Sequence, residues 1–295
     1  PPDLTVSLWA DEYRLISASN AMPGKWRTEV APYQKEIMDS VTDINVRRVS
    51  AMMAAQTGKT ACVENMIGYY ISQDPKSIIM MQPTSSDVSA WVEMKFNPMV
   101  NDTPTLSERI AKPRSRDGVN NQNMKSYPGG YLMFAYSGSS NTMRGRSAPI
   151  ILCDEIDGYE MTGEGDPVNL IWQRSATFGD QRKLVLTSTP TLKNASRIET
   201  AYLEGDQRQF YLPCPHCQEF HTLKWSQVQW DKDGDEHLPE TAFYVCESCA
   251  GIITDADKPS MLNQGEWRAK EKFKGHASFH INELYSPFRK FSDVA

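Results

Sequence analysis

Short apolar runs separated by helical patterns recur through the first two thirds of the chain. The apolar runs cover residues 46–54, 76–84, 130–138, 149–156 and 182–191. Runs of this length, bounded by polar or turn-forming residues, predict buried strands. The segments between them that carry helical periodicity, an N-cap signal or an early proline cover residues 32–41, 59–72, 85–100 and 166–177. Strands alternating with helices indicate an α/β fold with a largely parallel sheet flanked by helices.

The character of the sequence changes after about residue 210. Cysteines, tryptophans and short β-like stretches replace the alternation of apolar runs and helical patterns. We therefore expect a boundary near 208–212. The expected parts are an N-terminal helical segment over 1–45, an α/β core over 46–209 and a small module over 210–295.

The composition is that of an ordinary globular protein. Of 295 residues, 40% are hydrophobic and 23% charged, and the net charge of −6 gives no overall sign of nucleic-acid binding. No apolar run approaches the roughly 18 residues of a membrane span, and the first residues lack a signal-peptide pattern. We therefore expect no membrane association and a reducing compartment, with Cys62 and Cys153 as small core residues.

Residues 53–60 match part of the phosphate-loop pattern G-x-x-x-x-G-K-[ST], but Met53 stands where the first glycine is expected. In such a loop, backbone N–H groups and a helix N-terminus bind phosphates, the lysine reaches the β- and γ-phosphates, and the hydroxyl ligates Mg²⁺. A lone GKT also begins ordinary helices, but here a predicted strand precedes it and a predicted helix follows it. The candidate nucleotide ligands are Gln56, Thr57, Gly58, Lys59 and Thr60.

Two consecutive acids, Asp154 and Glu155, follow the apolar residues of the run at 149–156. At the end of a buried strand, Asp154 can hold Mg²⁺ and Glu155 can polarise the water that attacks the γ-phosphate. A strand running into an acidic surface turn gives the same dipeptide, so this pair alone decides nothing. Together with Lys59, however, the pair predicts an ATPase that uses ATP and Mg²⁺.

Two further segments are candidates for the same site. Thr187 and Ser188 end a predicted strand, where their hydroxyls can sense the γ-phosphate or serve as ordinary turn residues. About 25 residues before the loop, Tyr33 can stack on adenine and Gln34 can bond its edge, although Tyr33 equally suits a helix core.

An arginine is also expected, because negative charge spreads over the γ-phosphate oxygens in the transition state. Arg144 and Arg146 lie just before the Asp-Glu strand. We expect one of them, with Arg144 preferred, to reach the ATP of a neighbouring subunit. A solvent-facing basic turn is the alternative interpretation.

Four further cysteines form two C-x-x-C pairs with 28 residues between the pairs. They are Cys214, Cys217, Cys246 and Cys249. Two such pairs, each after a β-like stretch, predict a zinc ribbon with tetrahedral, structural Zn²⁺. His216 and His221 are near enough in sequence to substitute, but four cysteines suffice. Two disulfides are disfavoured in a reducing compartment.

Several segments resemble the lambda-type large terminase subunit of tailed bacteriophages. They are AAQTGKT, RGRSAPIILCDEID, LTSTPT, YLPCPHCQEFHTLKW and the stretches 23–41, 265–269 and 276–288. The resemblance covers nearly the whole chain, with the motifs in the family's order. It implies an ASCE-type P-loop NTPase followed by a zinc-ribbon module. The implied activity is that of a viral DNA-packaging motor, which hydrolyses ATP to translocate double-stranded DNA into a procapsid.

The resemblance also implies partners and residue roles. The partners are viral DNA, a small terminase subunit, the portal of the procapsid and copies of the same chain in a ring, in the host cytoplasm. The family pattern assigns phosphate binding to Gly58, Lys59 and Thr60, and adenine contact to Tyr33 and Gln34. It assigns magnesium binding and water activation to Asp154 and Glu155, and the coupling of hydrolysis to movement to Thr187 and Ser188. The arginine that acts on a neighbouring subunit is assigned to Arg144. The family's nuclease part is expected beyond Ala295.

Two other functions fit parts of the sequence. A helicase-like translocase shares the loop and the acids but needs a second RecA-like domain. A zinc-bearing DNA-binding or scaffold module would carry a degenerate loop without activity. The polar stretch 107–130 is a predicted loop or irregular hairpin. Its basic part, residues 107–125, can grip DNA phosphates or be an ordinary solvated surface. The basic residues of this part are Arg109, Lys112, Arg114, Arg116 and Lys125.

Overall fold

The computed structural model describes residues 4–18, 20, 22–110, 121, 123–143, 145–191 and 195–295. Within these residues, the centre is a ten-stranded sheet in the order β10-β9-β15-β3-β8-β7-β4-β6-β5, with β14 paired to β9 beside this path. Every pair from β9 to β6 is parallel, whereas β10, β14 and β5 add antiparallel strands. The strands are β3 (Arg48–Met53), β4 (Ile78–Gln82), β5 (Met124–Tyr127), β6 (Gly130–Tyr136), β7 (Ile150–Asp154), β8 (Lys183–Ser188), β9 (Arg208–Pro213), β10 (Phe220–His221), β14 (Glu266–Arg268) and β15 (His276–Ile281).

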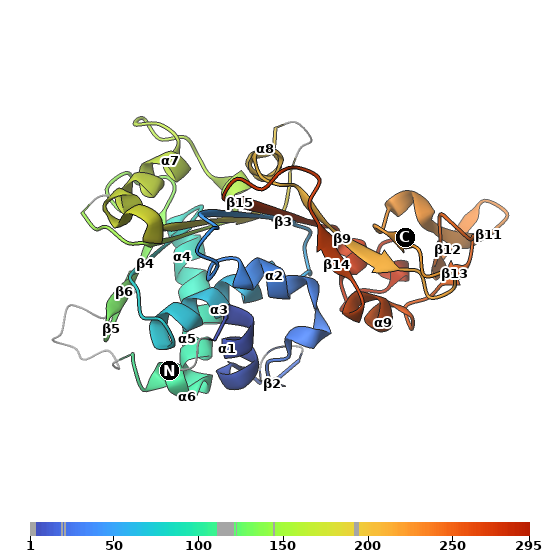
Figure 1. Ribbon diagram of the computed structural model, residues 1–295, viewed down its shortest axis with the longest axis horizontal. Coiled ribbons are helices and arrows are strands. Elements are labelled where there is room, and N and C mark those ends of the chain that lie inside the picture. The colour runs from blue at the N-terminus through green and yellow to red at the C-terminus, as the bar shows by residue number, and fades with distance from the viewer. Residues whose placement is uncertain are drawn as a thin grey trace.

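Helices cover both faces of this sheet (Figure 1). On one face lie α1 (Val6–Tyr13), α2 (Tyr33–Asp39), α3 (Lys59–Ser72), α4 (Ser85–Trp91) and α5 (Asn97–Asp102), and on the other lie α7 (Pro167–Trp172) and α8 (Arg197–Glu204). Side chains of one strand alternate between two apolar cores. Ile78 and Met80 belong to the core under α3, and Ile79 and Met81 to the core under α7 and α8. The apolar runs are therefore uninterrupted because both faces are buried.

The predicted α/β sheet is confirmed, with two local differences in the helices. The helix expected over 85–100 contains a π-helical segment, Val92–Phe96, between α4 and α5. The helix expected over 166–177 begins at Pro167, capped by the Asp166 carboxylate on the Asn169 N–H at 3.1 Å, and continues as 3₁₀ turns over Gln173–Gln181. Cys62 and Cys153 are buried, as expected. Among the described helices, none combines the length and the hydropathy that crossing a bilayer requires.

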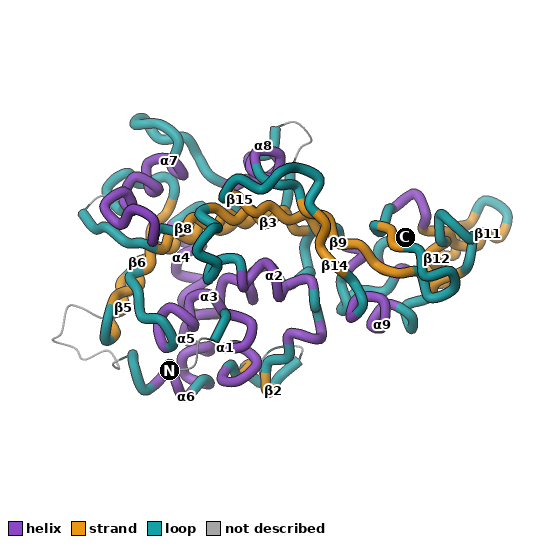
Figure 2. Tube along the Cα trace, viewed as in Figure 1, coloured by secondary structure: helices purple, strands orange, loops and turns teal. Residues whose placement is uncertain are grey.

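The chain after residue 210 leaves the large sheet and then returns to it. Residues 214–263, here called the cysteine lobe, carry a small sheet of β11 (Val228–Asp233), β12 (Glu236–Val245) and β13 (Ile252–Ile253), with α9 (Lys258–Asn263) beside it. This lobe and the C-terminus lie at one end of the molecule (Figure 2). Strand β15 then pairs with β3, in register His276 to Arg48. The topology thus differs from the expected division near 208–212, because residues of the last part complete the central sheet.

The buried histidine at the start of β15 gives the fold a pH dependence. His276 is 9% exposed, and its Nε2 lies 2.8 Å from the Ser50 hydroxyl. Burial, reinforced by the nearby charge of Arg48, lowers the pKa of His276 from 6.5 to about 4. The unfolded chain therefore binds the proton more readily, and the stability that the neutral ring supplies above pH 6.5 is lost as the pH falls toward 4.

We expect His276 to make unfolding more favourable by about 3 kcal/mol over this pH interval. Urea unfolding of the unchanged chain and of His276→Gln, each at pH 7 and at pH 4, measures this contribution. The variant should lose less stability on acidification. An equal loss in both proteins would mean that His276 does not titrate in this window.

Candidate nucleotide site and cysteine cluster

The phosphate loop connects β3 to α3 and has the backbone shape that phosphate binding needs. Gln56 and Gly58 have left-handed φ values of 59° and 83°. A Cβ on Gly58 would lie 2.0 Å from Gln34 Nε2, so both the backbone and the space require glycine there. Met53 instead ends β3 in strand pairing with Ile281, without a positive φ. The missing first glycine is therefore no obstacle, because its position belongs to the strand.

Tyr33 and Gln34 hold the loop from α2. The Tyr33 hydroxyl and the Gln34 amide both donate to the Thr57 carbonyl, at 2.9 and 3.0 Å. Tyr33 is fully buried and packs edge-on against Phe210, and this burial raises its pKa. Tyr33 lines neither of the two cavities described below, so its position fits the helix-core alternative rather than stacking on adenine. Thr57 is also buried, and its hydroxyl donates to the Ala54 carbonyl at 2.6 Å.

Lys59 and Glu155 meet at the carboxyl edge of the sheet. The Lys59 amine contacts a Glu155 carboxylate oxygen and donates to the Thr189 hydroxyl at 3.1 Å. These residues are brought together because β8 alone separates β3 from β7, so the ends of three parallel strands lie side by side. Glu155 has the left-handed backbone φ 53°, ψ 47°. For a residue with a Cβ this conformation costs about 1–3 kcal/mol, a strain common at functional sites.

Asp154 sits deeper than Glu155, at the end of β7. One of its carboxylate oxygens accepts from the Thr187 hydroxyl at 2.6 Å and the other from the Gln82 amide at 3.3 Å. Burial raises the pKa of Asp154, and the Thr187 bond and the Lys59 charge oppose that rise. A cation close by therefore favours the ionised carboxylate that a magnesium site needs.

The last two residues of β8, Thr187 and Ser188, each contact one of the two acidic side chains. Thr187 donates to Asp154, whereas the Ser188 hydroxyl lies 3.4 Å from the second Glu155 carboxylate oxygen. The Thr189 N–H approaches the same oxygen at 3.5 Å. The hydroxyl run thus fixes the orientation of both carboxylates.

A cavity of about 500 Å³ opens over these groups. Gln56, Gly58, Lys59, Thr60 and Glu155 line it, so most of the loop residues expected from the sequence face one space. The side chains of Thr57, Asp154, Thr187 and Ser188 support this space from behind and are not among its lining residues. Thr60 begins α3 beside Lys59 with its side chain toward the cavity, as a magnesium ligand requires.

An apolar cavity of about 350 Å³ adjoins the first. Trp26, Gly58 and Phe288 line both, and the second is completed by Val30, Ala31 and Gln34 among others. The site therefore has a polar compartment at the start of α3 and an apolar compartment beside it. This division matches a nucleotide, whose phosphates are charged and whose base is flat and mostly apolar.

The lining residues that sequence reasoning missed include Trp26, Thr189 and Phe288. Each lies in a segment that the sequence does single out, namely 23–41, 182–191 and 276–288. The sequence feature that could have predicted them is an aromatic or hydroxyl side chain next to a motif. This feature has little predictive value, because such residues more often serve in packing or in turns.

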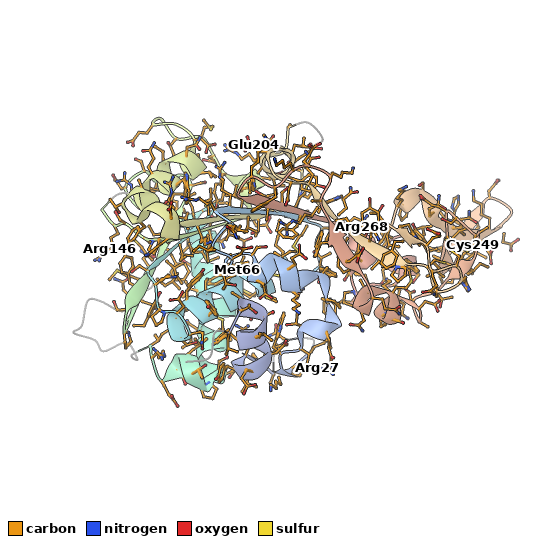
Figure 3. The ribbon with its side chains drawn as sticks, viewed as in Figure 1. Arg27, Met66, Arg146, Glu204, Cys249 and Arg268 are labelled. Carbon is orange, nitrogen blue, oxygen red and sulfur yellow. The ribbon has the colours of Figure 1, made fainter. Side chains whose placement is uncertain are left out.

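The structure describes only some of the basic residues that are expected to act on a neighbouring subunit or on DNA. Arg144 lies outside the described residues, as do Lys112, Arg114 and Arg116. Arg146 is exposed at the edge of the molecule, 5.3 Å over the Tyr131 ring, and well away from Met66 in the middle of α3 (Figure 3). Lys125 is buried in β5, and burial lowers its pKa, so it adds little to a DNA-binding surface.

The four lobe cysteines come together, with Cys249 at the opposite end of the molecule from Arg146 (Figure 3). Their sulfur atoms all lie within 4.8 Å of one another. The distances are 3.8 Å between Cys214 and Cys249 and 3.9 Å between Cys217 and Cys246. Zn–S bonds of about 2.3 Å in a tetrahedron place sulfurs about 3.8 Å apart, so the cluster fits zinc.

The two turns that present these cysteines are alike. After the second cysteine of each pair stands a residue in the left-handed conformation, Gln218 or Ala250. The N–H of each donates to the carbonyl of the first cysteine, at 2.9 and 3.0 Å. His216 Nε2 lies instead 2.7 Å from the Ile252 carbonyl, and His221 stacks on Tyr244. Neither histidine joins the cluster, so the ligand set is the four thiols.

A phosphate loop between a strand and a helix, facing an Asp-Glu pair across one inserted strand, defines a P-loop NTPase. The model of the family described as "Phage terminase large subunit gpA, ATPase domain" matches residues 20–267. The chain belongs to this family.

Two relatives agree with this membership, and one solved structure has a similar fold. The chain is 27% identical to the terminase large subunit of Enterobacteria phage P21 over 329 aligned positions and 26% identical to that of Escherichia phage lambda over 330. Each alignment covers all of this chain and 49% of the relative, so the chain spans about half the length of these proteins. The crystal structure of the HK97 bacteriophage large terminase is similar in fold, with a TM-score of 0.53 and 15% identity over 68% of this chain and 41% of that one.

Proposed function

We propose that this chain is the ATP-hydrolysing motor part of a viral terminase large subunit and drives double-stranded DNA into a procapsid. The observation that carries the proposal is the meeting of Lys59 and Glu155, with Asp154 beside them, at the edge of a cavity that the phosphate loop also lines. Family membership and the terminase relatives support the same assignment.

The contact between Lys59 and Glu155 supports a way of controlling hydrolysis. The Lys59 amine pairs with the Glu155 carboxylate. A triphosphate over Gly58 and the start of α3 offers that amine a stronger anionic partner. Glu155 then becomes free to accept a proton, while Ser188 and the Thr189 N–H keep its second oxygen in place.

The chemical step is a transfer of the γ-phosphoryl group to water. Water forms a bond to the γ-phosphorus, the bond to the bridging oxygen of ADP breaks, and Glu155 takes the proton of the water. Mg²⁺, held by Thr60 and Asp154, would neutralise charge on the phosphate oxygens. Loss of the phosphate would reach Thr187 and Ser188 through the Asp154 and Glu155 carboxylates that they contact, which makes them the coupling residues of this proposal.

The base belongs in the apolar compartment. Gln34 lines this compartment and donates its amide N–H to the Thr57 carbonyl, so its side-chain oxygen remains available as an acceptor. Adenine carries an exocyclic amino donor, and guanine carries a carbonyl acceptor in the corresponding place. This difference favours ATP over GTP.

The wider assembly follows from the same assignment. In a ring of identical chains in the host cytoplasm, Arg144 of one chain would act on the ATP of its neighbour, with Arg146 as the alternative. The small terminase subunit and the portal are the proposed partners, and exposed Arg109 is the described member of the proposed DNA grip. The nuclease of such a subunit would lie outside the residues of this chain.

We infer that the four thiols of the cysteine lobe bind one structural Zn²⁺ as thiolates. The sulfur spacing, the paired turns and the absence of a fifth ligand among the described residues support this inference. Bound zinc would cross-link the two turns that hold the lobe together.

Replacing Lys59 with alanine tests the nucleotide site directly. We expect the affinity for ATP to fall about 100-fold or more and hydrolysis to be lost, because a charge-assisted phosphate contact disappears while Glu155 remains as a nearby negative charge. Titration calorimetry with ATP and a phosphate-release assay give the two measurements.

The matched control is Lys35→Ala, which removes the same charge from an exposed position on α2. This control should bind and hydrolyse ATP normally. Unchanged ATP affinity in Lys59→Ala would contradict the proposed site and favour a module whose loop is degenerate.

A further inference from the structure

The segment that follows β15 touches the nucleotide cavities and the cysteine lobe at the same time. We propose that this segment, residues 282–291 and here called the strap, places Phe288 over the purine base of the bound nucleotide. The proposal rests on the proposed function, since it names a residue that selects the base at the same site. It adds a specificity residue from a part of the chain far in sequence from the phosphate loop.

The strap is joined to the phosphate loop at its start and its middle. The Ala54 N–H donates to the Ile281 carbonyl at 2.9 Å, just before the strap begins. Within the strap, the buried Ser286 hydroxyl donates to the Gln56 carbonyl at 2.6 Å. The same hydroxyl accepts from the Phe288 N–H at 3.2 Å. One serine therefore sets the distance between the loop and Phe288.

The strap is joined to the cysteine lobe through its second half. The Lys258 amine, at the start of α9, donates to the Arg289 carbonyl at 2.8 Å and to the Ser286 carbonyl at 3.4 Å. The Phe291 N–H donates to the Asp255 carboxylate at 3.0 Å. Contacts on both sides leave Phe288 between two fixed ends of the strap.

Phe288 is exposed, whereas the other aromatic side chains of the strap are buried. Tyr285 and Phe291 are 3% and 1% exposed, whereas Phe288 is 49% exposed and lines both cavities. Trp26 lines the same two cavities, and its ring N–H donates to the Thr28 hydroxyl at 2.9 Å, which fixes the ring plane. The apolar compartment therefore has two aromatic walls.

Two aromatic walls suit a flat heterocycle better than they suit phosphate. Aromatic side chains stack on any nucleobase because each base presents a π-face, and this contact is absent from an inorganic phosphate chain. In this proposal Phe288 and Trp26 contact the base of the nucleotide, whereas Gly58 and Lys59 contact its phosphates. Purines, with the larger π-face, should gain more than pyrimidines.

The experiment compares ATP with inorganic tripolyphosphate on the unchanged chain and on Phe288→Ala. We expect the dissociation constant for ATP to rise about tenfold in the variant and that for tripolyphosphate to stay within about twofold. At saturating ATP, kcat should also stay within about twofold, so the loss appears in KM. Phe288→Tyr, which keeps the ring, should bind ATP as the unchanged chain does.

The matched control is Phe220→Ala, which removes a partly exposed phenyl ring from the cysteine lobe away from both cavities. It should leave both dissociation constants unchanged. Equal loss of ATP and tripolyphosphate binding in Phe288→Ala would overturn the proposal, because the ring would then only support the loop. Unchanged ATP affinity in Phe288→Ala would overturn it as well and leave the ATP site intact, whereas failure of the unchanged chain to bind ATP would overturn the proposed function itself.

Discussion

Replacing Glu155 with glutamine should leave ATP binding intact and lower the rate of hydrolysis by about 100- to 10,000-fold. An amide of the same shape cannot take the proton of the attacking water. The Lys59 amine pairs with the Glu155 carboxylate, and the variant removes this negative charge, which competes with the phosphates for the amine. ATP affinity should therefore be equal to that of the unchanged chain or higher.

Two measurements separate these effects: phosphate release at saturating ATP and Mg²⁺, and the equilibrium affinity for ATP. Glu160→Gln is a matched control, because Glu160 is an exposed glutamate five residues further on. Its hydrolysis rate should be normal. Normal turnover in Glu155→Gln would remove Glu155 from the proposed role, and a loss of ATP affinity would mean that the side chain instead holds the loop.

The convergence of the site could be predicted because it depends on local patterns and one topological rule. The apolar runs identify β3, β7 and β8 as buried parallel strands, and the carboxyl ends of such strands share one edge. Asp154 and Thr187 stand at such ends, and Lys59 follows the loop that leaves a third, so their proximity is expected from the pattern. The hydrogen bond from Thr187 to Asp154 also depends on the register that pairs these two residues across β8 and β7.

The side of the cavity that Phe288 lines could not be predicted, because its position depends on strand pairing between segments far apart in the sequence. Nothing in residues 276–281 indicates that β15 inserts between β9 and β3, since many strands fit the same alternation of side chains. Without that pairing, nothing brings Phe288 to the cavities that Trp26 lines. For Tyr33 the sequence left two interpretations open, helix core and adenine contact. The packing of Phe210 against its ring places it in the core.

Removing one ligand of the cysteine cluster should unfold the cysteine lobe while the large sheet remains folded. The lobe is small, and among the described residues its own sheet has three strands, so it has little apolar core to replace the metal. In zinc-finger peptides the metal contributes about 10–16 kcal/mol at neutral pH, far more than a module of this size can lose. We therefore expect Cys217→Ser to purify without zinc and with a cysteine lobe unprotected from hydrogen exchange.

The unchanged chain should contain about one zinc ion per molecule, measured by elemental analysis, and Cys62→Ala should keep it, because Cys62 is buried outside the cluster. ATP affinity gives a second measurement, since Lys258 and Asp255 hold the strap from inside the lobe. An unfolded lobe releases that end of the strap, so Cys217→Ser should bind ATP more weakly but bind tripolyphosphate normally. Full zinc content in Cys217→Ser would contradict the four-thiolate site, and unchanged ATP affinity in a zinc-free variant would show that the strap is held by the phosphate loop alone.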